Sequence, residues 1–270
     1  MSDINKLETI ARQVRRDILL MLNAAGSGHT GGSLSVVDIL VALYFGGVMR
    51  YRADEPQWEE RDRLVLSKGH ACPALYAVLA RAGFFDRDLL FSLRKLGSPL
   101  QGHPDSRKLP GVEASTGSLG NGIAQAVGMA LSASVLGRSY RVFCVIGDGE
   151  MQEGIVYEAL MAASHYGLSN LVVIVDNNGL QIDGACKDVM NIYPIEEKFK
   201  AFNFETRTVN GHDFKELLEL FGSLSDSKRP VGIVAKTVKG KGVSFMENRV
   251  EYHGIAPNDE ELQKALKELE

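Results

Sequence analysis

Two apolar, β-branched runs that each end in short polar residues constrain the fold of this chain more than any other feature. The run 142–146 leads into a Gly-Asp-Gly centred on Asp148, and the run 171–176 leads into an Asn-Asn pair that ends at Asn178. Asn178 follows Asp148 by 30 residues, about the length that a strand, a helix and a second parallel strand require. Both side chains are therefore expected at the carboxyl edge of one sheet, where α/β domains bind ligands.

The chemistry of these two side chains suits a divalent metal held against a diphosphate. A hard cation such as Mg²⁺ prefers oxygen ligands in near-octahedral geometry and shares its shell readily with phosphate oxygens. The carboxylate of Asp148 and the amide oxygen of Asn178 would leave room for such oxygens. The sequence therefore predicts a metal-anchored diphosphate at this edge.

Helical and strand-like segments alternate along the rest of the chain. Strands are predicted at residues 142–146, 171–176 and 231–237, which are apolar throughout, as strands covered by helices on both faces should be. Residues 96–121 are rich in Gly, Pro and Ser and are predicted to form a long ordered loop. The alternation predicts one α/β domain over residues 1–270, with a mostly parallel sheet. Helices are predicted at residues 7–25, 36–44, 71–82, 123–136, 153–166 and 213–224.

Composition narrows the classes of partner. The net charge is −4 with acids and bases interspersed, so no basic stripe favours nucleic acid and no cationic amphipathic helix favours a membrane surface. No apolar stretch approaches the roughly 20 residues that span a bilayer, and a cytoplasmic location is expected. The three cysteines lack metal-type spacing and are expected to be reduced thiols.

Five of the six histidines have a glycine beside them. Glycine lets the backbone approach a ligand closely, and histidine changes its protonation near neutral pH. Together the pairs predict a polar site built from loops. The five histidines are His29, His70, His103, His212 and His253.

Three further segments each have an interpretation that requires no ligand. The loop 116–122 precedes a helix, so its amides could meet an anion or a heterocycle, or it could simply pack on the sheet. Glu153 and Glu158 could be solvated residues that complement a helix dipole. Lys239 and Lys241 could be solvated or could approach a phosphate. The glycine fingerprints of dinucleotide-binding and P-loop proteins are not met.

Several motifs occur in the order found in transketolase, a thiamine diphosphate enzyme, and the resemblance runs from about Leu7 to the C-terminus. It implies a three-layer α/β/α thiamine diphosphate-binding fold. A full transketolase is much longer, so the chain resembles the N-terminal subunit of a split, two-gene transketolase. Besides the Asp148 and Asn178 segments, the motifs are 27–32 (SGHTGG), 62–70 (DRLVLSKGH), 102–104 (GHP), 116–122 (TGSLGNG) and 252–254 (YHG).

The resemblance also implies roles for individual residues. Mg²⁺ would be held by Asp148, Asn178 and the backbone carbonyl of Leu180. Thiamine diphosphate would be contacted by Gly149, His70, His253, Gly117, Leu119 and Asn178, and Ile182 would help to force it into a bent shape. The sugar would face His29 and His103, and proton transfer would involve His29, His103 and His253. Contacts between subunits would involve Glu153 and Glu158.

Two positions depart from the family pattern. Thr30-Gly31 follows His29 where many transketolases have Pro-Gly, and Gly179 stands where the family often has a larger residue. Neither departure touches a side-chain metal ligand.

The resemblance implies transfer of a two-carbon ketol unit from a ketose phosphate to an aldose phosphate, with thiamine diphosphate and Mg²⁺. The glutamate that activates the cofactor belongs to the family's pyrimidine-binding domain, which is expected with the C-terminal domain on a separate chain. The chain alone is therefore expected to be inactive and to work with that C-terminal subunit, most simply as an α₂β₂ assembly.

Three alternatives remain. A related thiamine diphosphate enzyme could act on a branched or sulfonated sugar of the apulose phosphate or sulfofructose type, or could make a deoxyxylulose phosphate. The chain could be a non-catalytic scaffold, although the candidate metal ligands and site histidines are all present. A dehydrogenase is disfavoured because the glycine fingerprint is missing.

Overall fold

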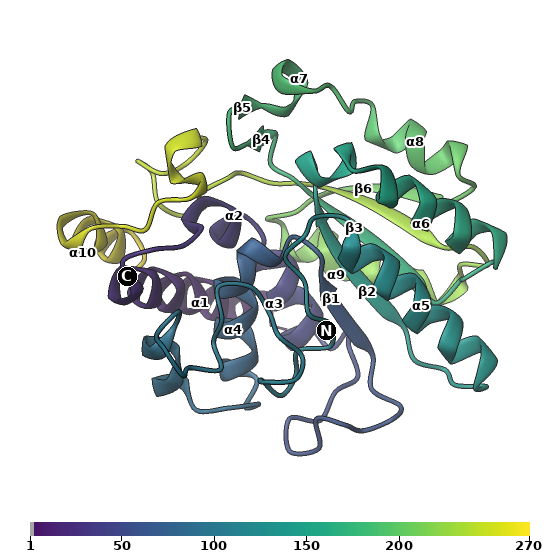
Figure 1. Ribbon diagram of the computed structural model, residues 1–270, viewed down its shortest axis with the longest axis horizontal. Coiled ribbons are helices and arrows are strands. Elements are labelled where there is room, and N and C mark those ends of the chain that lie inside the picture. The colour runs from purple at the N-terminus through teal and green to yellow at the C-terminus, as the bar shows by residue number, and fades with distance from the viewer. Residues whose placement is uncertain (1–2) are drawn as a thin grey trace.

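A computed structural model, which describes residues 3–270, shows a five-stranded parallel sheet between two layers of helices (Figure 1). The strand order is β1-β2-β3-β7-β6, and each neighbouring pair is parallel. The strands are β1 (Arg63–Leu66), β2 (Val142–Gly147), β3 (Leu171–Asn177), β6 (Glu205–Asn210) and β7 (Val231–Lys236).

The sheet divides the apolar interior into two cores, because successive side chains of a strand point to opposite faces. In β2, Phe143 and Val145 belong to one core, and Cys144 and Ile146 belong to the other. The first core contains α1 (Ile4–Ala25), α3 (Val37–Phe45), α4 (Cys72–Arg81), α9 (Phe214–Gly222) and α10 (Asp259–Glu268). The second contains α5 (Asn121–Val135), α6 (Gly154–His165) and α8 (Ile195–Ala201). The predicted three-layer α/β/α arrangement is confirmed.

Parallel pairing brings the carboxyl ends of the strands to one edge. Gly147 at the end of β2 lies opposite Asp176 in β3, and Asn177 lies opposite Lys236 in β7. The segments that follow these strands, including Asp148 and Asn178, therefore start side by side.

Short elements complete this edge. The helix α2 (Thr30–Ser35) lies between α1 and α3, and the hairpin of β4 (Leu180–Gln181) and β5 (Gly184–Ala185) leads into α7 (Cys186–Val189). Five 3₁₀ turns are present within the described chain: η1 (Gly69–Ala71), η2 (Arg87–Ser92), η3 (Gly149–Gln152), η4 (Ser223–Asp226) and η5 (Val250–His253).

All three predicted strands and all six predicted helices are present, with ends that differ by a few residues. Between η2 and α5, residues 93–120 contain no helix or strand, which confirms the long ordered loop predicted at 96–121. The two edge strands were not predicted: β6 is mostly polar, with Val209 as its one apolar residue, and β1 is only four residues long. Within residues 3–270, no helix is both long enough and apolar enough to cross a membrane.

Candidate active site

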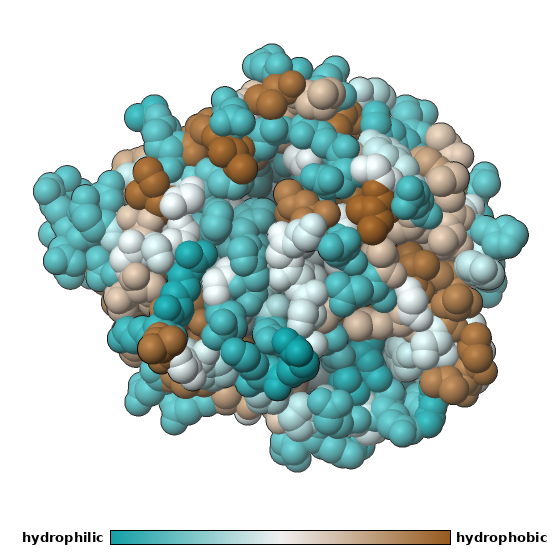
Figure 2. All heavy atoms as spheres, in the orientation of Figure 1, coloured by the Kyte–Doolittle hydropathy of each residue, from teal (hydrophilic) through white to brown (hydrophobic). Residues whose placement is uncertain are grey.

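A cleft of about 350 Å³ opens at the carboxyl edge of the sheet. Figure 2 shows this face of the molecule hollowed, with mostly teal (hydrophilic) and near-white residues in the hollow. All the residues predicted to hold the metal or the cofactor line this cleft, together with His29 and His103. The remaining lining residues are Gly32, Lys68, Gly147, Glu150, Gln152, Glu153, Gln181, Asp183 and Lys239.

The two predicted side-chain metal ligands are held by backbone amides from neighbouring loops. Asp148 is 2% exposed, and its carboxylate accepts hydrogen bonds from the amides of Gly149 at 2.8 Å and Gly179 at 2.5 Å. Gly179 has φ +78°, in the left-handed region that favours glycine. The amide oxygen of Asn178 accepts a hydrogen bond from the amide of Leu180 at 3.1 Å.

Burial raises the pKa of the Asp148 carboxyl, and the two amides oppose that rise. A nearby cation would favour the carboxylate further.

Three histidines gather in one triangle beside these ligands. The ring centroids of His29 and His70 are 5.1 Å apart, those of His29 and His253 are 5.6 Å apart, and those of His70 and His253 are 5.4 Å apart. They come from the start of α2, from η1 and from η5, which are far apart in the sequence. The Nδ1 atom of His29 is buried and has no hydrogen-bond partner among the described residues.

The surroundings keep these histidines neutral. Burial, followed by the charges of Arg94, His103 and two lysines, lowers the pKa of His29 to about 4. Burial and nearby cations also hold the pKa of His70 well below its usual value. The pKa of His253 falls to about 3, first through burial and then through the charge of Lys239. Near neutral pH, each ring therefore has one donor nitrogen and one acceptor nitrogen.

His103 lies on the long loop, at the outer part of the cleft, with an exposed side chain. A Cβ on Gly117 would approach the His103 ring at 3.2 Å, so this glycine permits the close contact. The guanidinium of Arg94 lies against Gly102, where a Cβ would meet its central carbon at 3.2 Å. Burial and the charge of Arg94 lower the pKa of His103.

The remaining predicted cofactor contacts occupy opposite walls. Leu119 is half-buried on the loop before α5, and Gly149 begins η3. Ile182, at the turn of the β4–β5 hairpin, is 66% exposed.

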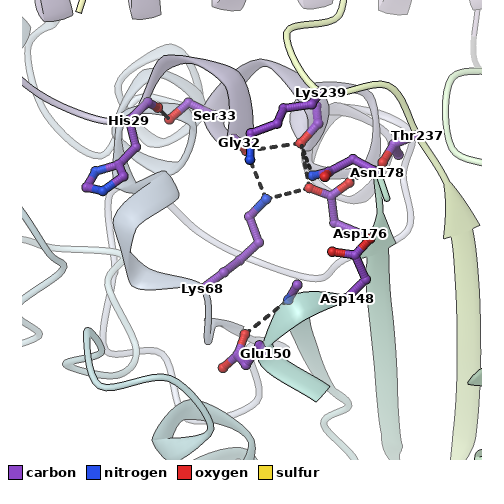
Figure 3. A network of polar contacts seen from close by, with 12 residues as sticks. His29, Gly32, Ser33, Lys68, Asp148, Glu150, Asp176, Asn178, Thr237 and Lys239 are labelled. Carbon is purple, nitrogen blue, oxygen red and sulfur yellow. Dashed lines mark hydrogen bonds and ion pairs between the residues drawn. The ribbon is translucent and has the colours of Figure 1, made fainter. Parts of the chain in front are cut away.

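A buried ion pair lies beside the two predicted metal ligands (Figure 3). The ammonium of Lys68 contacts Asp176, and it also donates to the carbonyl of Gly32 at 2.9 Å. Asp176 is fully buried and accepts further hydrogen bonds from Ser35, at 2.6 Å, and from Thr237. Burial alone would raise the pKa of Asp176, but Lys68 and the two hydroxyls hold it below its usual value.

Lys239 is the second buried cation of the site and is 1% exposed. Its Nζ lies 2.7 Å from Nδ1 of His253 and donates to the carbonyl of Leu180 at 3.3 Å. Burial, followed by the charge of Lys68, lowers the pKa of Lys239 to about 8. The interpretation of Lys239 as a solvated residue is therefore wrong, whereas Lys241 is partly exposed and pairs with Glu247 at 3.5 Å.

Glu150 ties three loops of the site together. Its buried carboxylate accepts hydrogen bonds from the amides of Gly147 at 3.0 Å and Gly120 at 2.7 Å, and from the hydroxyl of Ser67. This acid connects the ends of β1 and β2 to the loop before α5.

The structure separates other candidates from the histidine cluster. Glu153 precedes α6 at the rim of the cleft, and Glu158 is exposed on α6. His212 lies outside the cleft: its Nδ1 is 2.6 Å from Asp38, and its Nε2 accepts a hydrogen bond from the amide of Val238 at 2.8 Å. That histidine is structural, although it has the same glycine neighbour as the others.

Lys68, Asp176 and Glu150 were not predicted as site residues. Each lies within or beside one of the motifs, but a buried ion pair and a loop-connecting carboxylate depend on contacts 83 to 108 residues apart in the chain. For Asp176, the signal in the sequence was a charged residue at the end of an apolar strand.

The oxygen atoms available in the cleft fit a metal ion that also binds a diphosphate better than a metal ion bound by protein groups alone. Among residues 3–270, no group of three or more His, Cys, Asp or Glu side chains could hold a metal ion. Asp148, Asn178 and the Leu180 carbonyl supply three oxygens, which leaves positions for phosphate oxygens. The buried, unpartnered Nδ1 of His29 is a further polar atom that a ligand in the cleft could satisfy.

Comparison with known proteins places the whole chain in one group. Residues 7–269 match the family described as "Transketolase, thiamine diphosphate binding domain". The chain is 38% identical to one of the subunits of the apulose-4-phosphate transketolase of Phocaeicola vulgatus, over 98% of this chain and 94% of that protein. It is 40% identical to the 6-deoxy-6-sulfo-D-fructose transketolase subunit SqwG of a Clostridium species, over 98% of this chain and 96% of that protein.

The fold is also similar to that of solved transketolases. The transketolase of Campylobacter jejuni superposes with a TM-score of 0.93 at 35% identity over 99% of this chain. The chain spans 43% of the length of that enzyme.

Proposed function

This chain belongs to the transketolase family, as a thiamine diphosphate-binding domain, and from this premise we propose that it is the diphosphate-binding subunit of a two-chain transketolase. The proposed reaction is reversible transfer of a two-carbon ketol unit from a ketose phosphate to an aldose phosphate. The observation that carries the proposal is the triangle of neutral histidines beside Asp148 and Asn178 at one edge of the sheet.

The residues present suit the cofactor. Asp148, Asn178 and the Leu180 carbonyl would hold Mg²⁺, and Lys239 would place a positive charge near the diphosphate. Gly149 and Gly117 leave the cleft walls free of side chains where backbone would approach the cofactor. Bound thiamine diphosphate supplies a carbon that accepts the electron pair released when a bond beside a carbonyl breaks.

The histidines supply orientation and proton transfer. A neutral imidazole can donate to a carbonyl oxygen and accept from a hydroxyl, which bond cleavage beside a hydroxyl-bearing carbon requires. His29 and His103 lie toward the sugar in this proposal. The ring of His253 is 5.6 Å from that of His29, and His253 also contacts Lys239, which donates to the Leu180 carbonyl. We assign His29, His103 and His253 to this role, and His70 to the cofactor.

A modified sugar is the second candidate substrate. It is favoured because this chain is similar to two transketolase subunits over almost their full length. The two relatives covered almost completely are named for apulose-4-phosphate and for 6-deoxy-6-sulfo-D-fructose, both modified ketoses. We propose that the donor of this chain is drawn from the same class or is an ordinary ketose phosphate.

The same relatives support a second chain in the assembly, because they are named as subunits. We propose that a C-terminal, pyrimidine-binding transketolase subunit completes the site, most simply in an α₂β₂ assembly in the cytoplasm. Glu153 at the cleft rim and Glu158 on α6 are exposed and would contact other subunits.

Calorimetry tests the cofactor and partner assignments together. Thiamine diphosphate and Mg²⁺ are titrated into the chain alone and into the chain mixed with the product of its neighbouring gene. We expect tight, metal-dependent binding in the mixture only. Asp148→Asn should weaken that binding by about 10- to 100-fold, since it removes a charged ligand. Asp183→Asn is the matched control, because Asp183 lines the same cleft but is exposed.

Absence of binding in the mixture, with both proteins folded and associated, would overturn the cofactor assignment and favour a scaffold. A panel of ketose donors and aldose acceptors with the assembled protein then identifies the substrates.

A further inference from the structure

Lys239 and His253 form a contact that determines which nitrogen of the histidine carries its proton. The ammonium nitrogen lies 2.7 Å from Nδ1 of His253. The lysine stem passes over Gly31, where a Cβ would lie only 2.8 Å from Cγ of Lys239. The hydrogen bond to the Leu180 carbonyl at 3.3 Å fixes the same ammonium from another side. Both the stem and the ammonium group of Lys239 are therefore held in place by neighbouring backbone.

The direction of this hydrogen bond follows from the donor inventory of the two groups. A lysine ammonium has three donors and no acceptor, so Nδ1 must be the acceptor and must carry no proton. A neutral imidazole then carries its proton on Nε2. Within residues 3–270, Nε2 of His253 makes no hydrogen bond, and the ring lines the cleft.

The other charged or titratable groups near the ring do not compete for Nδ1. His29 and His70 contact His253 ring to ring, at 5.6 Å and 5.4 Å between centroids. The ammonium of Lys68 is engaged by Asp176 and the Gly32 carbonyl.

We propose that Lys239 is a positioning residue that holds His253 as the Nε2–H tautomer, so that this nitrogen donates a hydrogen bond to an oxygen of the sugar. The proposal rests on the proposed function for the identity of the ligand, but the tautomer is a property of the chain itself. It gives His253 the role of a fixed donor, distinct from His29, whose Nδ1 is unpartnered among the described residues.

Nitrogen-15 NMR of histidine-labelled protein, as the full chain in its assembly, tests the tautomer directly. A His253→Gln variant assigns the resonances. We expect the wild-type spectrum to show an unprotonated Nδ1 and a protonated Nε2. In Lys239→Met, the chemical shift of Nδ1 should move toward that of a protonated nitrogen, because the ring of His253 then samples both neutral tautomers and the imidazolium form. Lys239→Arg retains a donor-only cation and should restore the wild-type pattern. Lys241→Met removes a positive charge from the same loop and should change nothing.

Kinetics at saturating cofactor separate this role from a purely structural one. Lys239→Met should lower kcat by about 10- to 100-fold, and the acid limb of its pH profile should move toward neutrality because the nearby cation is gone. A protonated Nδ1 in the wild type, or superimposable wild-type and Lys239→Met spectra, would overturn the proposal. If the wild-type assembly has no transketolase activity while the spectra behave as expected, the proposed function fails and the tautomer assignment stands.

Discussion

The ammonium of Lys68 and the carboxylate of Asp176 form an ion pair in which the two side chains are only 2% and 0% exposed. Asp176 is the last residue but one of β3, two residues before Asn178, so the pair lies next to the candidate metal site (Figure 3). A charge buried this deeply is tolerated only while its partner remains.

Lys68→Met should therefore lower the free energy of unfolding by about 3–5 kcal/mol, because it leaves the Asp176 carboxylate uncompensated. Urea denaturation measures the loss. Adding Asp176→Asn to Lys68→Met should recover a substantial part of it, since no unpaired charge then remains. A single-variant loss below about 1 kcal/mol would show that the pair is not needed to stabilise the site.

A second prediction concerns Thr30, one of the departures from the family pattern. Its hydroxyl donates a 2.6 Å hydrogen bond to the carbonyl of Ile255, which connects α2 to the segment that carries His253. A proline at this position could not make the bond. Thr30→Val keeps the shape and removes the donor, at an expected cost of about 1–2 kcal/mol.

Hydrogen exchange should locate the effect of Thr30→Val in residues 250–257, with faster exchange than in the wild type. Thr9→Val is the matched control, because the hydroxyl of Thr9 makes a similar 2.8 Å bond to a carbonyl but is exposed. Equal changes in the two variants would contradict a specific link between α2 and the His253 segment.

The sequence predicted the interior of the fold and the edge that carries the site, because both follow from local patterns. The buried strands β2, β3 and β7 are apolar throughout, and Asp148 and Asn178 lie at two of their ends. The edge strands β1 and β6 could not be recognised in this way, because β1 has only four residues and β6 is mostly polar.

Among the site residues, glycine-flanked histidines predicted the cluster of His29, His70 and His253 but did not distinguish them from His212. That distinction depends on packing: His212 faces Asp38 and the Val238 amide behind the sheet edge, whereas the others face the cleft. The roles of Lys68, Asp176 and Lys239 arise from contacts between distant segments, which single-sequence patterns do not encode.

A third prediction follows from the depressed pKa values of the cluster. The folded-state pKa is about 4 for His29 and about 3 for His253, below the value of about 6.5 for an unfolded histidine. Between these values the unfolded chain binds more protons than the folded chain. The stability that these groups contribute is therefore complete above about pH 6.5 and falls as the pH drops toward about 4 and then about 3.

Thermal denaturation between about pH 7 and pH 4 checks this direction. The melting temperature should fall with decreasing pH, and His29→Gln should make the dependence shallower because one of the groups is removed. Asp176 adds to the loss once the pH falls below about 4, the usual pKa of a carboxyl, because its own pKa in the folded chain is lower still. A His29→Gln profile parallel to the wild type throughout would contradict the pKa assigned to His29.

The last prediction concerns His103, whose side chain is exposed at the mouth of the cleft beside Gly117. His103→Ala should lower the turnover of the assembled enzyme by about 10²- to 10⁴-fold, the range that a positioned proton-transfer group contributes. The melting temperature should stay close to that of the wild type, because no core contact is lost. Ser106→Ala, an exposed change on the same loop, is the control and should keep full turnover. Steady-state assays with a ketose phosphate donor measure the effect, and full activity in His103→Ala would remove His103 from the set of residues that act on the sugar.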